Sequence, residues 1–291
     1  MTFTCELLKI NSIKLLTLKI RYHIIIKTEK EFHNTENKME KEKIKSIEKA
    51  LDLLELLPNN KEIGITEISK ELHMGISTVH RILNTLKSRG YIIQNKQRSK
   101  YALGIQLFVL GCKVQSAMNL IESVTPFLHK LSQYTKESIN FAILEGREVV
   151  CLSKIESSEV LRTDIKIGAR LPAHCTAVGK ALLAFLPERE FTILYGKANK
   201  KLSTSTPNSI SSLIELKKRL KKIKKDGYST DEEELNIGIN CFAVPILNKD
   251  GKSVASISIT GPSSRFTLSE KEKLKDVLMS ISKDVSNHLI G

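Results

Sequence analysis

The fold is decided by residues 66–91, TEISKELHMGISTVHRILNTLKSRGY. This segment predicts a short helix capped by Thr66 and a tight turn over the tripeptide at 73–75, His-Met-Gly. A second helix then follows, capped by Ser77 and ended by Gly90. Its spacing predicts a buried apolar stripe made of Val79, Ile82, Leu83 and Leu86. Two helices joined by a tight turn are typical of a helix-turn-helix.

The sequence on either side of this segment completes a winged helix-turn-helix. Apolar residues with helical spacing (Ile44, Ile47, Leu51, Leu54) predict an amphipathic helix that stops at Pro58. After the second helix, two short strands, 91–94 and 100–103, flank a polar tip at 95–99. We therefore expect a winged helix-turn-helix DNA-binding domain over residues 39–103.

The charge distribution supports a polyanionic partner. The chain has 291 residues, 46 lysines and arginines against 32 acids, and a net charge of +14. Lysine-rich composition alone is weak evidence, but residues 72–121 contain no acid at all. The cations in that interval are Arg81, Lys87, Arg89, Lys96, Arg98, Lys100 and Lys113. A basic tract over a predicted helix-turn-helix indicates nucleic-acid binding, whereas the lysine-rich stretch 217–225 has the spacing of a solvated helix face.

Burial of the apolar stripe turns a polar face of the second helix outward. Short hydroxyls, amides and cations suit phosphate oxygens and base edges. The candidate DNA-binding residues on this face are Ser77, Thr78, His80, Arg81, Asn84, Thr85 and Lys87, and those of the hairpin are Lys96, Arg98 and Lys100. The alternative is a solvated helix face with ordinary polar residues. The turn, the hairpin and the absence of acids favour double-stranded DNA.

The second half of the chain has a different pattern of predicted helices and strands. Residues 104–119 predict a linker helix, and residues 120–291 predict an α/β domain. Its strand candidates are 138–144, 149–155, 241–247 and 253–260, and its helix candidates are 120–134, 175–186, 209–226 and 269–289. Long helices that flank a mixed or antiparallel sheet indicate an α+β sensor domain rather than a doubly wound nucleotide-binding fold.

At this point the chain resembles the IclR family. The resemblance is carried by ALDLLE at 50–55, EISKEL at 67–72, STVHRIL at 77–83 and RGY at 89–91, and it continues from about 44 to 289. It implies an N-terminal half that binds operator DNA as part of a dimer or a dimer of dimers. It also implies a C-terminal GAF-like domain that binds a small metabolite, often a carboxylate.

The predicted effector site centres on GARLPAHCTAVGK at 168–180. Small residues here allow a close approach of backbone N–H groups at a helix start to an anion or carbonyl. Ser256, Ser258 and Thr260 alternate along one predicted strand and would line up three hydroxyls. The resemblance implies an effector site made of Ala177, Val178, Asp231, Cys241, Ser258 and Thr260. Thr260 and Val178 differ from the residues of many relatives, which concerns the identity of the effector.

Other functions find less support. The five cysteines are Cys5, Cys112, Cys151, Cys175 and Cys241, and they form no CxxC pair, so we expect no disulfide framework, no metal site and no cofactor. A thiol enzyme built on Cys175 and His174 is the main alternative, although sequence neighbours rarely form a working dyad. A constitutive DNA-binding protein whose C-terminal domain only dimerises is a third possibility.

The N-terminal 38 residues differ from the rest, since they show no sustained period and are followed by Met39 and a charged helix start. We expect either an over-extended reading frame or a disordered arm. No stretch is long and apolar enough to span a membrane or act as a secretory signal, so a cytoplasmic location is the default expectation. The sequence therefore predicts a transcriptional regulator, more often a repressor, whose operator affinity responds to a metabolite.

Overall fold

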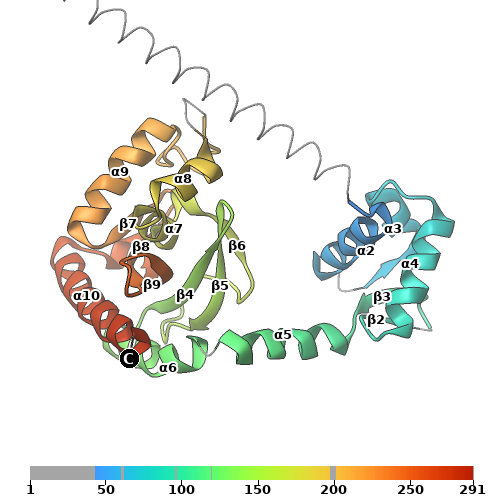
Figure 1. Ribbon diagram of the computed structural model, residues 1–291. Coiled ribbons are helices and arrows are strands. Elements are labelled where there is room, and N and C mark those ends of the chain that lie inside the picture. The colour runs from blue at the N-terminus through green and yellow to red at the C-terminus, as the bar shows by residue number, and fades with distance from the viewer. Residues whose placement is uncertain (1–42, 60–61, 96, 119, 197–200, 291) are drawn as a thin grey trace, which may run out of the picture. The chain divides into compact units, whose positions relative to one another are not determined.

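The computed structural model describes residues 43–59, 62–95, 97–118, 120–196 and 201–290. The chain divides into two compact units. The boundary between them falls between Lys113 and Val114, within helix α5 (Ile105–Met118). Figure 1 shows the elements of each unit. Residues 1–38 and Lys96 lie outside the described residues, so the structure does not test the predictions made for them.

The first unit is a winged helix-turn-helix, as predicted. Its elements are α2 (Lys45–Leu56), η1 (Leu57–Asn59), β1 (Ile63–Gly64), α3 (Ile65–Glu71), α4 (Ile76–Ser88), β2 (Ile92–Asn95) and β3 (Lys100–Leu103). The strands form an antiparallel sheet in the order β1-β3-β2, with β2–β3 as the wing. Val79 and Leu83 of α4 are fully buried in the core of this unit, and Ile82 and Leu86 pack against them, as the apolar stripe predicts.

Both predicted helix caps are wrong. Helix α3 starts at Ile65 with Gly64 as its N-cap, and Glu67 Oε2 accepts from the Gly64 N–H at 2.8 Å. At the start of α3 the acceptor is therefore the Glu67 carboxylate rather than the Thr66 hydroxyl. Helix α4 starts at Ile76 with Gly75 as its N-cap, because the turn ends in extended backbone at Gly75. The Ser69 hydroxyl donates to Met74 O at 2.5 Å and so fixes where the turn ends.

Helix α2 also differs from the expected pattern. Ile47 and Leu51 of the predicted apolar series are 54% and 51% exposed, and Ile44 precedes the helix as its N-cap. The core is filled instead by Leu53 and Leu57. The periodicity therefore locates the helix correctly, but most of its apolar stripe lies outside the core of this unit.

The second unit is an α+β domain built on one six-stranded antiparallel sheet in the order β6-β5-β4-β9-β8-β7. Its strands are β4 (Ser138–Glu145), β5 (Glu148–Ile155), β6 (Arg170–Pro172), β7 (Ser229–Glu232), β8 (Ile239–Leu247) and β9 (Ser253–Pro262). Its helices are α6 (Leu120–Thr135), η2 (Ala173–Cys175), α7 (Ala177–Ala184), α8 (Glu188–Tyr195), α9 (Leu213–Asp226), η3 (Ser263–Arg265) and α10 (Leu268–Ile290). The four predicted strands and four predicted helices are present, whereas β6, β7 and α8 were not predicted.

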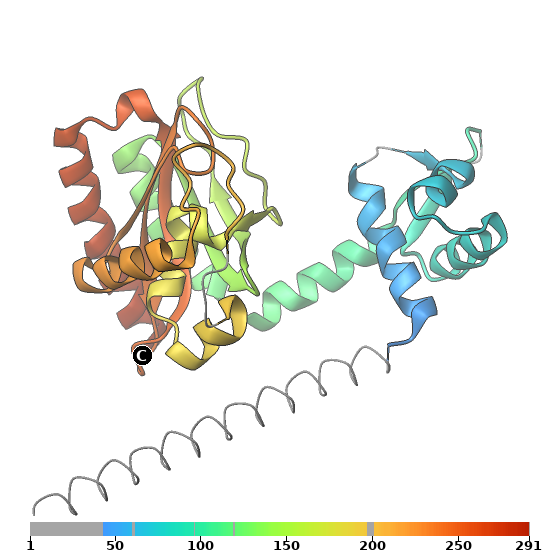
Figure 2. The same ribbon diagram turned by 90° about the horizontal axis from the view of Figure 1, so that it is seen from above.

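Two apolar clusters lie on opposite sides of this sheet (Figures 1 and 2). Helices α6 and α10 pack together against one face, where Phe141 and Ile257 are fully buried. Helices α7 and α9 cover the other face, where Leu216 and Ala243 are fully buried. Helix α7 packs against β8 and β9, and the effector-site cavity described below is lined by its first residues and by residues of these strands.

Candidate functional site

The exposed face of α4 carries part of the predicted DNA-binding set. Ser77, His80, Asn84 and Lys87 are all exposed on it. Asn84 Nδ2 donates to His80 Nδ1 at 3.2 Å, so these two side chains, one helical turn apart, are hydrogen-bonded to each other. This arrangement presents donors and acceptors suited to base edges.

The remaining α4 candidates lie toward α2. Thr78, Arg81 and Thr85 line a groove whose other wall includes Ile47 and Leu51. The Thr85 hydroxyl donates to Arg81 O at 3.0 Å, so it is held against its own helix. The structure therefore divides the predicted α4 residues between an outward face and a groove.

The wing brings an acid next to the basic tract. Arg98 is exposed and its Nη1 lies 3.5 Å from Glu62 Oε2, while Asn95 Nδ2 donates to Glu62 Oε1 at 2.9 Å. An exposed pair of this kind is weak, so Arg98 remains available to a phosphate. Lys87 Nζ donates to Gln94 Oε1 at 3.0 Å and links α4 to the wing. The basic tract itself contains no acid, but the residue that precedes β1, Glu62, lies beside the wing.

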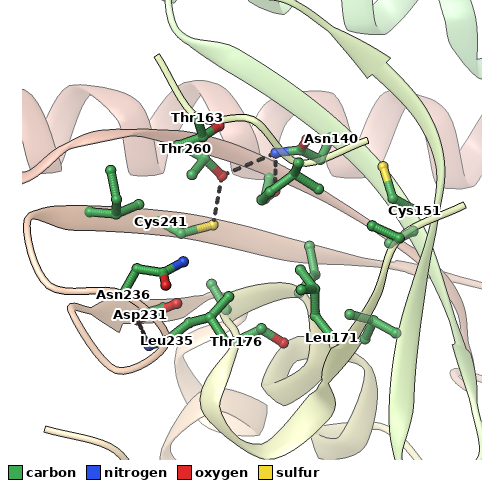
Figure 3. A pocket seen from close by; sticks show the side chains of 18 of the residues that line it. Asn140, Cys151, Thr163, Leu171, Thr176, Asp231, Leu235, Asn236, Cys241 and Thr260 are labelled. Atoms are coloured by element: carbon green, nitrogen blue, oxygen red, sulfur yellow. Dashed lines mark hydrogen bonds between the residues drawn. The ribbon is translucent and has the colours of Figure 1, made fainter. Parts of the chain in front are cut away.

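The second unit contains a cavity of about 670 Å³ between α7 and the sheet. A volume of this size is in the range of small-molecule sites. All six residues of the predicted effector site line it: Ala177, Val178, Asp231, Cys241, Ser258 and Thr260. Their role in binding stays a prediction, but the structure brings residues from α7, β7, β8 and β9 to one place (Figure 3).

The residues at the start of α7, Thr176, Ala177 and Val178, line one side of the cavity. Thr176 caps the helix: its hydroxyl accepts from Gly179 N at 3.2 Å, and its carbonyl accepts from Lys180 N at 3.0 Å. The N–H groups of Ala177 and Val178 are then the ones for which the helix itself offers no acceptor. A Cβ on Gly179 would collide with the backbone of Ala173, so only glycine allows α7 to lie this close to η2. The arrangement suits an anion or a carbonyl oxygen.

Asp231 faces the same cavity from β7. Its Oδ1 accepts from Glu234 N at 2.7 Å and Leu235 N at 3.4 Å. Burial raises the pKa of this carboxyl to about 6, and the nearby Lys180 cation only partly offsets that effect. The carboxyl is therefore poised to change its protonation close to neutral pH.

Lys180 is fully buried and forms an ion pair with Glu234. Burial lowers the Lys180 pKa, while Glu234 opposes the change. Thr206 and Ser209 hydroxyls donate to Glu234 O at 3.1 and 2.6 Å. The pair thus joins α7 to the turn that follows β7.

The sheet side of the cavity is a hydrogen-bonded polar strip. Asn140 Nδ2 donates to Thr260 Oγ1 at 3.1 Å and to Ser258 Oγ at 3.4 Å, and Thr260 Oγ1 donates to Cys241 Sγ at 3.1 Å. Burial raises the Cys241 pKa to about 12, so this thiol is a neutral polar group. Ser256 does not join the strip, because its hydroxyl donates to Val244 O at 2.8 Å. Of the three β9 residues expected to line up, Ser258 and Thr260 line the cavity and Ser256 does not.

The sequence analysis did not predict several of the residues that line the effector cavity. Asn140 lies opposite Ser258 in the β4–β9 ladder, which only the strand pairing reveals. Thr163 belongs to an irregular segment between β5 and β6, where no periodicity exists to assign it. A polar residue inside an otherwise apolar strand, as at Asn140, was the one available signal.

The alternative thiol site is not assembled. Cys175 is fully buried, and burial raises its pKa to about 11. His174 Nε2 donates to Ser203 O at 2.7 Å, so the imidazole is engaged with a neighbouring loop. Among the described residues no group of three or more His, Cys, Asp or Glu could hold a metal ion, and no helix is long and apolar enough to cross a membrane.

Comparison with known proteins identifies the family of this chain. The family model for the bacterial transcriptional regulator IclR C-terminal domain matches residues 112–287, and the IclR helix-turn-helix model matches residues 46–96. The chain belongs to the IclR family. It is thus a DNA-binding transcriptional regulator with a C-terminal effector-binding domain, which confirms the resemblance noted in the sequence.

Individual IclR-family proteins match over nearly the whole described chain. The regulator KdgR of Dickeya chrysanthemi is 35% identical over 84% of this chain and 80% of its own length. The transcriptional repressor IclR of Escherichia coli is 30% identical over 84% of this chain and 89% of its own length. The crystal structure of Thermotoga maritima IclR superposes with a TM-score of 0.69 at 30% identity, covering 84% of this chain and 98% of that one.

Proposed function

We propose that this IclR-family regulator is a repressor that binds a pseudo-palindromic operator as a dimer and whose operator affinity changes when a small carboxylate occupies the effector cavity. One observation carries the carboxylate assignment: Thr176, Ala177 and Val178, the N-cap and first two residues of α7, line the cavity. Helix N-termini favour anions through both their N–H groups and the helix dipole. The similarity to the transcriptional repressor IclR of Escherichia coli supports the repressor assignment.

DNA binding through α4 separates into base and phosphate contacts. Asn84 is exposed on the outward face and has the amide geometry that recognises adenine, whereas Lys87 is suited to phosphate. Asn84→Ala should weaken operator binding by about 1–3 kcal/mol and leave non-specific binding nearly unchanged. Lys87→Gln should weaken both and reduce the slope of log affinity against log salt by about 1. Fluorescence anisotropy with the gene's own upstream DNA measures both effects.

Lys249→Gln, in the exposed turn between β8 and β9, is the matched control because it removes a cation from the other unit. An unchanged salt slope is expected for it. A Lys87→Gln protein with wild-type salt dependence, or an Asn84→Ala protein that loses specific and non-specific binding equally, contradicts the assigned roles.

The exposed apolar stripe of α2 supports dimerisation. Ile44, Ile47 and Leu51 are each more than half exposed, a pattern that a monomeric soluble domain seldom maintains. A two-fold dimer would present two copies of α4 to paired half-sites. Leu51→Glu should shift the protein toward monomer in analytical ultracentrifugation and weaken operator binding. Ile214→Glu, at a position on α9 that is more exposed still, should leave both unchanged.

The effector assignment is tested by a thermal-shift screen of small carboxylates, keto acids and sugar acids. Operator affinity is then measured at a saturating concentration of each acid that stabilises the protein. Coupling of about 1–3 kcal/mol would change operator affinity about 5–150-fold. An operator affinity that no bound acid alters would favour the constitutive DNA-binding alternative. Turnover of an acid that Cys175→Ala abolishes would favour the thiol enzyme, which the buried, high-pKa thiol does not support.

A further inference from the structure

Helix α9 of the second unit carries a block of exposed cations. The helix lies on the outer side of α7 (Figure 1) and buries one apolar face there, made of Leu213, Leu216, Leu220 and Ile223. Its other faces carry seven cations: Lys217, Lys218, Arg219, Lys221, Lys222, Lys224 and Lys225. Lys217 is half-buried and the other six are exposed. The helix contains two acids, Glu215 and Asp226, so its solvent-facing surface has almost a single sign of charge.

The rest of the described chain neutralises little of this charge. Among the described residues one of the seven cations pairs with an acid, since Lys217 Nζ lies 3.4 Å from Glu188 Oε1. Lys224 Nζ lies 5.9 Å from the centre of the Phe185 ring, a contact that holds the side chain but leaves its charge.

Helix α10 shows that a lysine-rich composition does not by itself produce such a surface. Three lysines in its first half each pair with a glutamate: Lys271 with Glu232, Lys273 with Glu270 and Lys275 with Glu272. A solvated helix commonly alternates the two signs in this way. The block of unneutralised cations is therefore particular to α9.

The cations of α9 also repel one another. Lys218 and Lys222 are four residues apart, as are Lys221 and Lys225, and like charges at this spacing destabilise a helix. The helix dipole favours cations in the last turn, which accounts for Lys224 and Lys225 but not for those further back. A polyanion bound along this face would remove the repulsion.

We propose that the exposed cations of α9 form a second, sequence-independent DNA contact through the phosphates of double-stranded DNA. The 14 residues of α9 span about 21 Å. Duplex DNA carries one negative charge per about 1.7 Å of its axis, so about 12 phosphate charges fall within that length. The family already makes DNA a partner of this chain, and this contact lies outside the helix-turn-helix. A membrane surface fits less well, because the apolar face of α9 is buried and cannot insert.

The test compares two full-length triple variants with the same change in net charge. One combines Lys218→Gln, Lys222→Gln and Lys225→Gln on α9, and the control combines Lys273→Gln, Lys275→Gln and Lys283→Gln on α10. Affinity for a random-sequence duplex is measured by fluorescence anisotropy as a function of salt. Three lost phosphate contacts should reduce the slope of log affinity against log salt by about 2.7. Between about 50 and 200 mM salt the wild type should therefore lose about 40-fold more affinity than the α9 variant, whereas the control should keep the wild-type slope.

A second measurement detects the contact directly. A photocrosslinking benzoylphenylalanine that replaces Lys222 should crosslink to the labelled duplex, and one that replaces Lys273 should not. The α9 variant should be at least as stable as the wild type in urea unfolding, because the charges it removes repel one another. A wild-type salt slope in the α9 variant, or no crosslink from position 222, would overturn the proposal. If that variant keeps its DNA affinity but loses affinity for poly-glutamate, the partner of α9 is an acidic protein and the DNA assignment is wrong.

Discussion

The protonation of Asp231 should make carboxylate binding depend on pH. This carboxyl lines the effector cavity together with the N–H groups at the start of α7, and burial raises its pKa to about 6. The charged groups near the Asp231 carboxyl are the Lys180 cation, from α7, and the Glu234 carboxylate, from the turn that follows β7. A bound carboxylate would add a second negative charge to this site. Since two carboxylates in one site do not both ionise readily, the ligand should bind together with a proton on Asp231.

The size of the effect follows from the pKa. If only the protein with neutral Asp231 binds, affinity is nearly constant below pH 6 and falls roughly tenfold for each pH unit above it. Between pH 5 and pH 8 the total loss is about 90-fold for a pKa of about 6. Near pH 7 most unliganded protein has Asp231 ionised, so binding should take up close to one proton per site.

Calorimetry in buffers of different ionisation enthalpy measures this proton uptake directly. The matched variant is Asp231→Asn, whose amide oxygen can still accept from Glu234 N and Leu235 N. It should bind the acid at pH 8 at least as well as the wild type does, with no uptake of a proton. Flat affinity between pH 5 and pH 8 in the wild type, or equal proton uptake by the variant, would refute the reasoning.

Folding stability should show the same titration. A carboxyl whose folded pKa is raised is destabilising when ionised, so its cost is absent below about pH 4 and fully present above about pH 6. A shift of about two units corresponds to about 3 kcal/mol. Asp231→Asn should therefore gain stability relative to the wild type as pH rises through this window, as measured by urea unfolding. A difference that does not change with pH would contradict the raised pKa.

Three further substitutions test the packing. Leu83→Ala should destabilise the first unit by about 2–5 kcal/mol in urea unfolding, because the side chain is fully buried; a loss below 1 kcal/mol would contradict its place in the core. Lys180→Met should cost about 3–5 kcal/mol since it leaves Glu234 buried without a partner, and the double variant with Glu234→Leu should regain most of that loss in calorimetry. Gly261→Ala should lower the melting temperature because its Cβ would collide with a neighbouring carboxyl, whereas Gly111→Ala has open space and should not.

The architecture was largely accessible from the sequence where periodicity governs. The apolar stripe of α4 and the strands of the wing follow from spacing alone, and the resemblance added the effector domain. The helix starts were not accessible, because Gly64 and Gly75 became caps through a Glu67 side chain and a turn geometry that propensity does not encode. Strand β7 was missed because its sequence, STDE, has no apolar alternation, and pairing with β8 alone makes it a strand.

The effector cavity was accessible only in part. Residues in motifs, such as Ala177 and Asp231, could be assigned by resemblance, and they do line one cavity. Asn140 and Thr163 could not, since their positions depend on strand register and on an anchored irregular segment. The exposed stripe of α2 is a different case: the period correctly predicts a helix, but it cannot distinguish a face that packs in its own unit from one that remains exposed.

The cavity wall and the end of α6 share one anchor. Glu137, two residues after α6, pairs with Arg265, which also donates to Leu161 O in the segment that carries Thr163. In the same segment the Ser157 hydroxyl donates to Lys136 O at 2.7 Å, and Lys136 directly follows α6. A ligand that repositions this segment therefore acts on residues bonded to the end of α6, and only residue 119 separates the start of α6 from α5. Hydrogen bonds thus connect the segment that carries Thr163 to the residues that directly follow α6, and contiguous contacts of this kind are what coupling of the cavity to α6 requires.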